Sequence, residues 1–257
     1  MSAATASTLL FVPGDRPDRF DKAAAAGADL VVLDLEDAVS ADAKDAARAN
    51  VAAWAAHRPC AVRINSADTP WFRADLDALS AKDVTIMVPK AEDPAVLAGI
   101  GGNVIALIET ARGVLNAPAI ASVPGVVRLA VGTFDLAAEL GVDPTDTEAL
   151  LPTRGALVLA SAAAGLPGPI DGVTAAIDEP DRIVADTTYA RRLGFAGKLC
   201  IHPRQLRPAA AALRPTEAQI GWARRIVEAS SGAVAQVDGE MVDKPVVDRA
   251  HAILARI

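Results

Sequence analysis

The stretch LVVLDLEDAV, residues 30–39, decides the fold expected for this chain. It opens with an unbroken apolar run and then places Asp34, Glu36 and Asp37 within four positions. Such a run is typical of a strand buried on both faces, as in a parallel sheet. Because side chains alternate along a strand, we expect Asp34 and Glu36 on one face and Asp37 on the other. Carboxylates at the end of a buried strand need partners, so we interpret them as part of a site rather than as the start of a turn.

Length and composition are those of one large folded domain. The chain has 257 residues, close to the ~250 residues of a single α/β barrel. Hydrophobic residues make up 52% and charged residues 22%, which excludes a disordered chain and allows a large core. The net charge of −7 argues against a general nucleic-acid or membrane-surface binder. Local arginines can still bind an anionic substrate.

Cysteine usage and the N-terminus indicate a reducing compartment. Cys60 and Cys200 lie in apolar, strand-like stretches without metal-ligand spacing, so we expect buried free thiols. Residues 1–20 lack a basic segment, and their apolar run is too short for a signal peptide. No stretch approaches the ~18 apolar residues that cross a bilayer. We therefore expect a cytoplasmic protein.

Apolar stretches alternate with helical patterns along most of the chain. The predicted strands span residues 8–13, 30–36, 60–65, 84–89, 104–109, 126–131, 169–173 and 198–201. The predicted helices span residues 16–26, 40–57 (with Ser40 as N-cap), 71–81, 94–100, 111–121, 133–140, 152–164, 180–193 and 216–230. This alternation predicts a parallel sheet, and eight such units predict a closed (β/α)8 TIM barrel. A doubly wound open sheet lacks support, because neither GxGxxG after the first strand nor GxxxxGK[ST] occurs.

Residues 232–257 follow the eight complete units and have a different pattern. We expect a hairpin around Asp238-Gly239 and then a short terminal helix. The predicted organisation is a catalytic barrel domain over residues 1–231 and a hairpin/helix extension over residues 232–257. Such an extension either covers the barrel or reaches a neighbouring subunit.

Two carboxylates at the ends of consecutive strands predict a metal site. Glu109 ends an apolar strand in ALIETARG, and Asp135 follows the next strand in AVGTFDLAAELG. The carboxyl ends of barrel strands share one face, where active sites form. Mg²⁺ typically takes one or two carboxylates together with waters and substrate oxygens. The alternative for Asp135 is an ordinary acid at a helix N-terminus, which the helix dipole favours.

Basic residues occupy the same predicted face. Arg63 ends a strand in AVRIN, and its guanidinium suits a carboxylate partner, either a substrate or a barrel acid. Lys90 in MVPKAE is interpreted as a lysine paired with a neighbouring acid, with a Schiff-base role as the alternative. His202 in CIHP is interpreted as a turn residue. Arg16, Arg19 and Lys22 follow the first strand, so they form either a phosphate-binding rim or a solvated helix face.

Eight motifs together resemble one known family. In chain order they read FVPGDRPDRFDKA, LDLEDAV, AVRIN, VPKAE, ALIETARG, GTFDLAAELG, GKLCIHP and MVDKP. They resemble the citrate lyase β-subunit-like family of the HpcH/HpaI aldolase superfamily, which includes citryl-, malyl- and citramalyl-CoA lyases. The resemblance implies a (β/α)8 barrel, usually trimeric. With Mg²⁺, such an enzyme cleaves or forms a C–C bond in a β-hydroxyacyl-CoA thioester, whose halves are an acyl-CoA and a 2-oxo acid.

The resemblance also implies roles for particular residues. Glu109 and Asp135 would bind the metal, and Arg63 would hold the oxo-acid carboxylate. Glu36 and Asp37 would act through metal-bound water. Asp34 lies one pleat deeper than Glu36, and we therefore expect it to be structural. The remaining roles go to Asp243, lent to the site of the next subunit, and to Arg16, Arg19 and Lys22, which would face the CoA phosphates. Two alternatives remain open: a CoA-independent, metal-dependent pyruvate aldolase, and a non-catalytic subunit that binds an acyl thioester.

Overall fold

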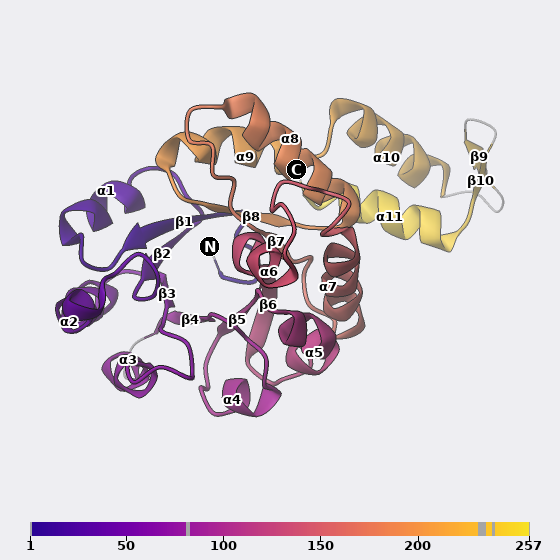
Figure 1. The fold of residues 1–257 in the computed structure, drawn as a ribbon. Helices are drawn as coiled ribbons and strands as arrows, with labels where there is room; N and C mark the ends of the chain where they lie inside the picture. Colours follow the sequence, from indigo (N-terminus) through magenta and orange to yellow (C-terminus); the bar gives the residue numbers. More distant parts are fainter. Residues whose placement is uncertain (1, 81–82, 231–234, 238–239, 257) are drawn as a thin grey trace. The chain divides into compact units, whose positions relative to one another are not determined.

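Eight parallel strands close into a barrel in which each strand pairs with its neighbours in chain order (Figure 1). This computed structural model describes residues 2–80, 83–230, 235–237 and 240–256. The barrel strands are β1 (Thr8–Pro13), β2 (Leu30–Asp34), β3 (Ala61–Arg63), β4 (Thr85–Val88), β5 (Val104–Ile108), β6 (Val126–Val131), β7 (Ile170–Asp171) and β8 (Gly197–Cys200). Closure comes from β1, which pairs with both β2 and β8. The predicted (β/α)8 barrel is confirmed.

Helices surround the barrel and connect its strands (Figure 1). They are α1 (Phe20–Ala24), α2 (Lys44–Ala55), α3 (Phe72–Leu79), α4 (Pro94–Ala98), α5 (Ala111–Ala121), α6 (Thr133–Leu140), α7 (Leu151–Ala163) and α8 (Pro180–Leu193). After β8 come the 3₁₀ turn η3 (Pro203–Gln205) and α9 (Leu206–Leu213), a helix that the sequence did not predict. Within the described ranges, no helix combines the length and apolar character needed to cross a membrane.

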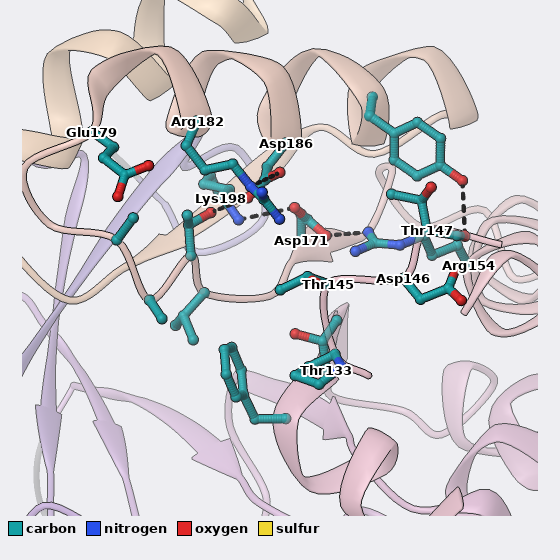
Figure 2. Close-up of a pocket in the computed structure, with 17 residues that line it drawn as sticks. Thr133, Thr145, Asp146, Thr147, Arg154, Asp171, Glu179, Arg182, Asp186 and Lys198 are labelled. Carbon is teal, nitrogen blue, oxygen red and sulfur yellow. Dashed lines mark hydrogen bonds and ion pairs between the residues drawn. The ribbon is translucent and has the colours of Figure 1, made fainter. Parts of the chain in front are cut away.

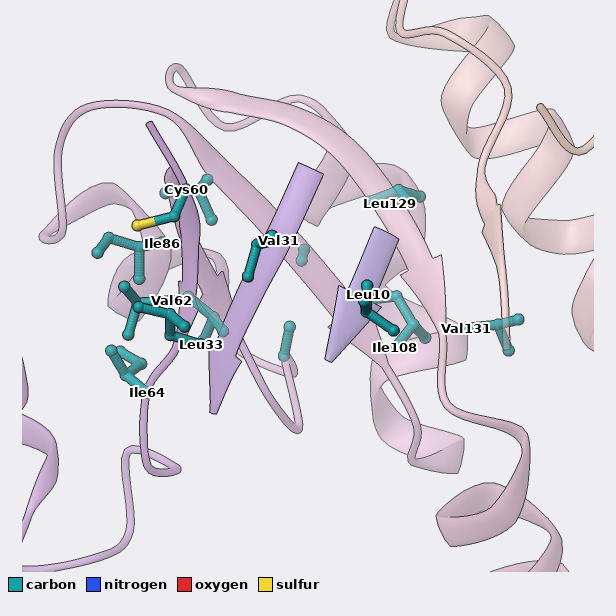
Figure 3. Packing of buried hydrophobic residues seen from close by; sticks show 14 of the residues in the cluster. Leu10, Val31, Leu33, Cys60, Val62, Ile64, Ile86, Ile108, Leu129 and Val131 are labelled. Atoms are coloured by element: carbon teal, nitrogen blue, oxygen red, sulfur yellow. The ribbon is translucent and has the colours of Figure 1, made fainter. Parts of the chain in front are cut away.

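The packing of strand β2 explains why its sequence is an unbroken apolar run. Leu30 and Val32 belong to a core made almost entirely of strand residues, which lies inside the barrel. Val31 and Leu33 belong to the larger core between the strands and the helices (Figure 3). Both faces of the strand are therefore covered, and all five of its residues are buried.

The structure corrects three details of the predicted elements. Strand β2 ends at Asp34 rather than at residue 36, because the Asp34 carboxylate accepts hydrogen bonds from the backbone N–H groups of Glu36 and Ala38 and turns the chain. Strand β7 is reduced to two residues. The Ser40 side chain donates to Asp42 instead of capping, and a 3₁₀ turn, η2 (Ala41–Ala43), precedes α2.

The C-terminal part of the chain forms a compact unit of its own, residues 211–257. Within it, α10 (Glu217–Ala229) packs against α11 (Lys244–Leu254), with Ala223, Ile226 and Ala250 buried between them. This packing groups α10 with the extension, so the unit begins earlier than the predicted boundary at residue 231. That the extension reaches a neighbouring subunit stays a prediction.

The predicted hairpin is present in the same unit. Strands β9 (Ala235–Val237) and β10 (Glu240–Val242) pair antiparallel, with Glu240 opposite Val237. The Asp238-Gly239 turn itself lies outside the described residues. The hairpin leads directly into α11, whose first turn is capped by Asp243.

Candidate functional site

Three barrel strands each direct one charged side chain toward the barrel interior at their carboxyl ends. Asp34, Arg63 and Glu109 follow the inward-facing residues Val32, Ala61 and Leu107 by two positions. Strand alternation therefore places Asp34 and Arg63 above the apolar interior core, and Glu109, which directly follows β5, lines the same cavity. Asp34 and Arg63 are also register partners on the adjacent strands β2 and β3.

The guanidinium of Arg63 forms ion pairs with all three acids of the LDLED stretch. Its Nε and Nη2 donate to the two carboxylate oxygens of Asp34, at 2.8 and 2.7 Å. Its Nη1 lies 3.0 Å from Glu36 Oε2 and 3.6 Å from Asp37 Oδ2. The pair with Glu36 lacks hydrogen-bond alignment, so its attraction is purely coulombic. Asp34 thus occupies the Nε/Nη2 edge of the fork, and the Nη1/Nη2 edge is where a further carboxylate can bind.

The acids after β2 lie on a tight turn, which overturns one expectation from the sequence. Asp37 was expected to point away from Asp34 and Glu36, but strand alternation ends at Asp34, and the turn brings Asp37 back toward Arg63. Lys44 holds this turn in place through hydrogen bonds to its backbone. Its buried ammonium donates to the carbonyl oxygens of Leu35 and Glu36, at 2.6 and 2.7 Å.

Glu109 is held in a tight, buried position. Its Oε1 accepts a hydrogen bond from the backbone N–H of Lys90 at 2.8 Å. Gly132 supplies the space beside it, since a Cβ there would lie 2.3 Å from Glu109 Oε2 and 2.5 Å from Glu109 Cβ. Burial, together with the negative charges of Glu36 and Asp135, raises the pKa of Glu109 to about 8. A cation placed beside it would favour its ionised form.

Asp135 approaches the same region from the next strand along. It lies in the first turn of α6, directly after β6, and its side chain is 41% exposed. The ammonium of Lys90 lies 3.9 Å from Asp135 Oδ2 and 3.2 Å from Glu36 Oε1. Lys90 is therefore paired with acids, as one reading of the sequence expected.

The same lysine bears on the Schiff-base alternative. Burial opposes the charged form of Lys90, yet the carboxylates of Glu36 and Glu109 raise its pKa overall. An imine-forming lysine must lose its proton at working pH, so this environment disfavours that role. For Glu36 burial is the stronger influence: it outweighs the attraction of Arg63 and raises the pKa of Glu36 to about 7.

A cavity of about 410 Å³ opens onto this cluster at the carboxyl end of the barrel. Its charged lining residues are Asp34, Asp37, Arg63, Glu109 and Asp135. Apolar walls come from side chains such as Phe11, whose ring lies 4.9 Å from the Arg63 guanidinium carbon, and Leu199. The predicted metal and carboxylate-binding residues therefore share one cavity.

The donor set fits a magnesium ion rather than a metal bound by protein ligands alone. In the part of the chain that the structure describes, no three His, Cys, Asp or Glu side chains converge as a metal-binding group. Glu109 and Asp135 offer two carboxylates in one cavity, and the raised pKa of Glu109 marks negative charge that lacks full compensation. Mg²⁺ takes one or two carboxylates and completes its shell with waters and substrate oxygens.

The remaining predicted residues lie outside this cavity. Arg16, Arg19 and Lys22 are exposed beyond the carboxyl end of β1, and Arg16 pairs with Asp18 at 3.0 Å. Asp243 belongs to the C-terminal unit, where its side chain accepts a hydrogen bond from the backbone N–H of Val246. CoA binding by the first group and catalysis by Asp243 both stay predictions.

A second cavity, of about 250 Å³, lies on the outer side of β7 and β8 (Figure 2). Asp171 is buried there between Arg154 and Lys198, and Lys198 also donates to the carbonyl of Gly172. Although burial disfavours its charged form, the two cations lower the pKa of Asp171. Arg182 at the rim pairs with Asp186. The ion pairs of Asp171 link residues on β7, β8 and α7, so we assign the cluster to joining these elements.

Sequence reasoning missed two groups that shape the site. Lys44 sits in the first turn of a helix, where a lysine is normally solvated, yet it is buried. Asp75 is fully buried in α3 and accepts from the backbone and side-chain amides of Asn65 at 2.9 and 2.6 Å, and from Arg48. The only available signal was Asn65 itself, a polar residue at the end of a predicted strand.

The comparisons with known proteins agree with this geometry. The profile of the HpcH/HpaI aldolase/citrate lyase family matches residues 7–203. A citrate lyase subunit beta-like protein of Mycobacterium tuberculosis is 39% identical over 260 residues, which cover 96% of this chain and 94% of that protein. A (3S)-malyl-CoA thioesterase of Cereibacter sphaeroides is 37% identical over 262 residues, which cover 97% of this chain and 92% of that protein.

A solved structure extends the likeness to three dimensions. The crystal structure of CitE from Mycobacterium tuberculosis, in complex with magnesium, acetoacetate and coenzyme A, aligns with a TM-score of 0.88 at 37% identity. The alignment covers 98% of both chains. From the profile match and the relatives together, the chain belongs to the HpcH/HpaI aldolase/citrate lyase family, and its resemblance to citrate lyase β-like proteins is confirmed.

Proposed function

We propose that this protein is a Mg²⁺-dependent carbon–carbon lyase acting on β-hydroxyacyl-CoA thioesters. It would cleave, or in reverse form, the bond between an acyl-CoA and a 2-oxo acid. One observation carries the proposal: Arg63, Glu109 and Asp135 line a single cavity at the carboxyl end of the barrel. The cavity therefore combines a carboxylate-binding cation with the two acids that fit a metal.

Glu109 and Asp135 would hold the magnesium ion. When bound there, Mg²⁺ supplies a Lewis acid that polarises the oxygens of the 2-oxo acid half and orients them. Solved relatives support this assignment, because CitE of Mycobacterium tuberculosis was crystallised with magnesium and with oxaloacetate, pyruvate or acetoacetate.

Arg63 would orient the substrate. Its Nε/Nη2 edge is held by Asp34, so the guanidinium is fixed before substrate arrives. The carboxylate of the 2-oxo acid half would bind at the Nη1/Nη2 edge. Because the guanidinium is fixed, a substrate carboxylate bound to it would hold the C–C bond in the orientation needed for cleavage.

Proton transfers would use the acids around Arg63. Glu36, with a pKa of about 7, is matched to accept the proton of the β-hydroxyl group, and Asp37 lines the cavity beside it. Loss of that proton drives cleavage of the C2–C3 bond, whose electron pair passes to the thioester enolate. The hydroxyl-bearing carbon becomes the carbonyl of the 2-oxo acid. Asp243 of a neighbouring subunit, in a homotrimer, would return a proton to the enolate carbon.

The exposed basic residues after β1 would bind the CoA moiety. Arg16, Arg19 and Lys22 follow a strand whose carboxyl end lies at the same face as the cavity. Phosphate groups at that rim would pair with them while the thioester enters the barrel. Coenzyme A in the CitE complex of Mycobacterium tuberculosis supports a CoA ligand.

The test is a panel of citryl-, malyl-, citramalyl- and methylmalyl-CoA, each assayed with Mg²⁺ and with EDTA. We expect at least one substrate to give equal amounts of acyl-CoA and 2-oxo acid, with turnover abolished by EDTA. Cleavage that continues in EDTA, or no 2-oxo acid from any member, overturns the proposal.

Hydrolysis of the thioester is the second candidate. It is favoured by one relative, the (3S)-malyl-CoA thioesterase of Cereibacter sphaeroides. The same panel separates the two reactions. Hydrolysis of malyl-CoA releases a free CoA thiol and malate, whereas the lyase reaction releases glyoxylate and keeps the thioester as acetyl-CoA.

A further inference from the structure

Lys90 contacts three acids at the carboxyl end of the barrel, two of which are the proposed metal ligands. Its backbone N–H donates to Glu109, and its ammonium pairs with Glu36 and approaches Asp135. We propose that Lys90 is a positioning residue whose ammonium holds these carboxylates together in the metal-free protein and is displaced when Mg²⁺ binds. This inference rests on the proposed metal-binding role of Glu109 and Asp135.

The backbone of Lys90 is strained in a way that serves Glu109. Lys90 has a φ of +45°, and among the described residues it is the only non-glycine residue with a positive φ. Residues other than glycine keep such a conformation only where the surroundings enforce it, and these positions cluster at functional sites. Here the strained backbone directs its N–H to Glu109 Oε1 at 2.8 Å, while the next residue, Ala91, donates to the carbonyl of Leu107.

The side chain of Lys90 reaches the other two acids from the same backbone position. Its Nζ lies 3.2 Å from Glu36 Oε1 and 3.9 Å from Asp135 Oδ2. The side chain is 39% exposed, so the ammonium can move into solvent without disturbing the core. A lysine on a flexible four-carbon stem suits this movement, whereas a planar, bidentate arginine does not.

An ammonium and a magnesium ion compete in this position. Both are attracted to the same carboxylate oxygens, and they repel one another. The ammonium therefore stabilises the acid cluster before the metal arrives and weakens the binding of the metal itself. Removing the ammonium leaves Glu36, Glu109 and Asp135 with Arg63, which pairs with Glu36, as the nearby cation, and so raises their attraction for Mg²⁺.

Calorimetric titration of substrate-free protein with MgCl₂ tests the inference without an activity assay. Lys90→Met removes the charge and keeps an unbranched side chain that is one atom shorter, while Lys90→Gly also removes the strain of the positive φ and retains the backbone N–H. We expect both variants to bind Mg²⁺ about tenfold more tightly than wild type. Arg112→Met is the matched control: Arg112 is an exposed cation on α5 that pairs with Glu92 at 3.7 Å, and its loss should leave the Mg²⁺ affinity unchanged.

Thermal melting gives an independent readout. Mg²⁺ should raise the Tm of Lys90→Met and Lys90→Gly by more than it raises the Tm of wild type, because it replaces the missing ammonium. If wild type binds Mg²⁺ but both Lys90 variants bind it equally or more weakly, the inference about Lys90 is overturned and the metal assignment of Glu109 and Asp135 stands. Failure of wild type to bind Mg²⁺ overturns the metal assignment, and the inference falls with it.

Discussion

Asp34 and Arg63 form the link between the walls of the site: two parallel hydrogen bonds, 2.8 and 2.7 Å long, join the carboxylate at the end of β2 to the guanidinium at the end of β3. The Asp34 carboxylate also accepts from the backbone N–H groups of Glu36 and Ala38. One buried acid therefore orients Arg63, the proposed substrate-binding residue, and shapes the turn that carries Glu36 and Asp37.

Asp34→Asn should lower both stability and turnover. The substituted amide places an N–H₂ group against one donor of Arg63 and removes the buried carboxylate that pairs with its Nε and Nη2. Loss of one partner from a buried ion pair typically costs about 3–5 kcal/mol, so we expect an unfolding free energy lower by about 3 kcal/mol in urea titrations. Turnover should fall because Arg63 and the turn both lose their fixed positions.

The control for this prediction is Asp178→Asn. Asp178 pairs with Arg204, but both side chains are about 70% exposed, and an exposed pair contributes at most about 1 kcal/mol. A loss for Asp34→Asn no larger than that of the control would mean that the Asp34–Arg63 pair does not hold the site together.

Glu109→Gln should separate stability from function. Because burial and neighbouring acids raise the pKa of Glu109 to about 8, its ionised form destabilises the metal-free protein. The neutral amide should therefore raise the free energy of unfolding at pH 8.5 by about 1 kcal/mol or more. The same change should abolish Mg²⁺ binding in calorimetry and Mg²⁺-dependent turnover. A variant with full activity, or one destabilised at this pH, would contradict the assignment.

The stability of the metal-free protein should fall as the pH rises through neutrality. Glu36 and Glu109 have pKa values raised from 4.5 to about 7 and about 8 in the folded protein. Between pH 4.5 and 8 the folded state therefore binds more protons than the unfolded chain, and the unfolding free energy decreases with pH. Mg²⁺ affinity should increase over the upper part of this range, because the metal requires ionised carboxylates.

Urea titrations at several pH values, with and without Mg²⁺, measure both trends. Glu109→Gln provides the reference, since it lacks one of the two titrating groups and should show a shallower pH dependence. A wild-type stability that rises between pH 6 and 8.5 relative to Glu109→Gln would show that these carboxyls do not have raised pKa values.

Much of the site could be predicted because the carboxyl ends of the strands can be located from the sequence pattern. Arg63 and Glu109 each follow an apolar strand run, so the barrel rule brings them to one face. The orientation of Asp37 was wrong because alternation applies only within a strand, and the turn begins at the residue after Asp34. No sequence period reveals that turn, since it depends on hydrogen bonds to a side chain.

The lysines of the site show the limit of sequence reasoning most clearly. Lys44 and Lys90 are ordinary residues by composition, and their importance comes from contacts across the fold: two carbonyl oxygens for Lys44 and three carboxylates for Lys90. The positive φ of Lys90 could not be predicted from the sequence either, because a lysine does not signal that conformation.

Gly132→Ala should disturb Glu109 although no charged residue is replaced. The added Cβ would lie 2.3 Å from Glu109 Oε2 and 2.5 Å from its Cβ, so the acid must move. We expect stability lower by about 1–3 kcal/mol and clearly weaker Mg²⁺ binding. Gly155→Ala, in α7, is the control: its Cβ would meet nothing within 4 Å, and alanine in a helix should stabilise by up to about 1 kcal/mol. Equal effects from the two changes would exclude Gly132 as the residue that makes room for Glu109.

Mixed oligomers should reveal whether two subunits share one site. Arg63 belongs to the barrel unit and Asp243 to the C-terminal unit, where its side chain caps α11. If Asp243 acts in a neighbouring site, an Arg63→Ala subunit can lend its intact Asp243 to the intact barrel of an Asp243→Ala subunit. Each variant alone should be inactive, and mixing them after subunit exchange should restore part of the activity.

The fraction restored follows from the pairing of subunits. In a random mixture of equal amounts, about one site in four combines an intact barrel with an intact Asp243 from its neighbour, so activity near a quarter of wild type is expected. Mass spectrometry of differently tagged subunits verifies the exchange, and Asp248→Ala, another acid on α11, controls for damage to that helix. No recovery after verified exchange would restrict Asp243 to capping α11 and require the proton donor to come from the barrel itself.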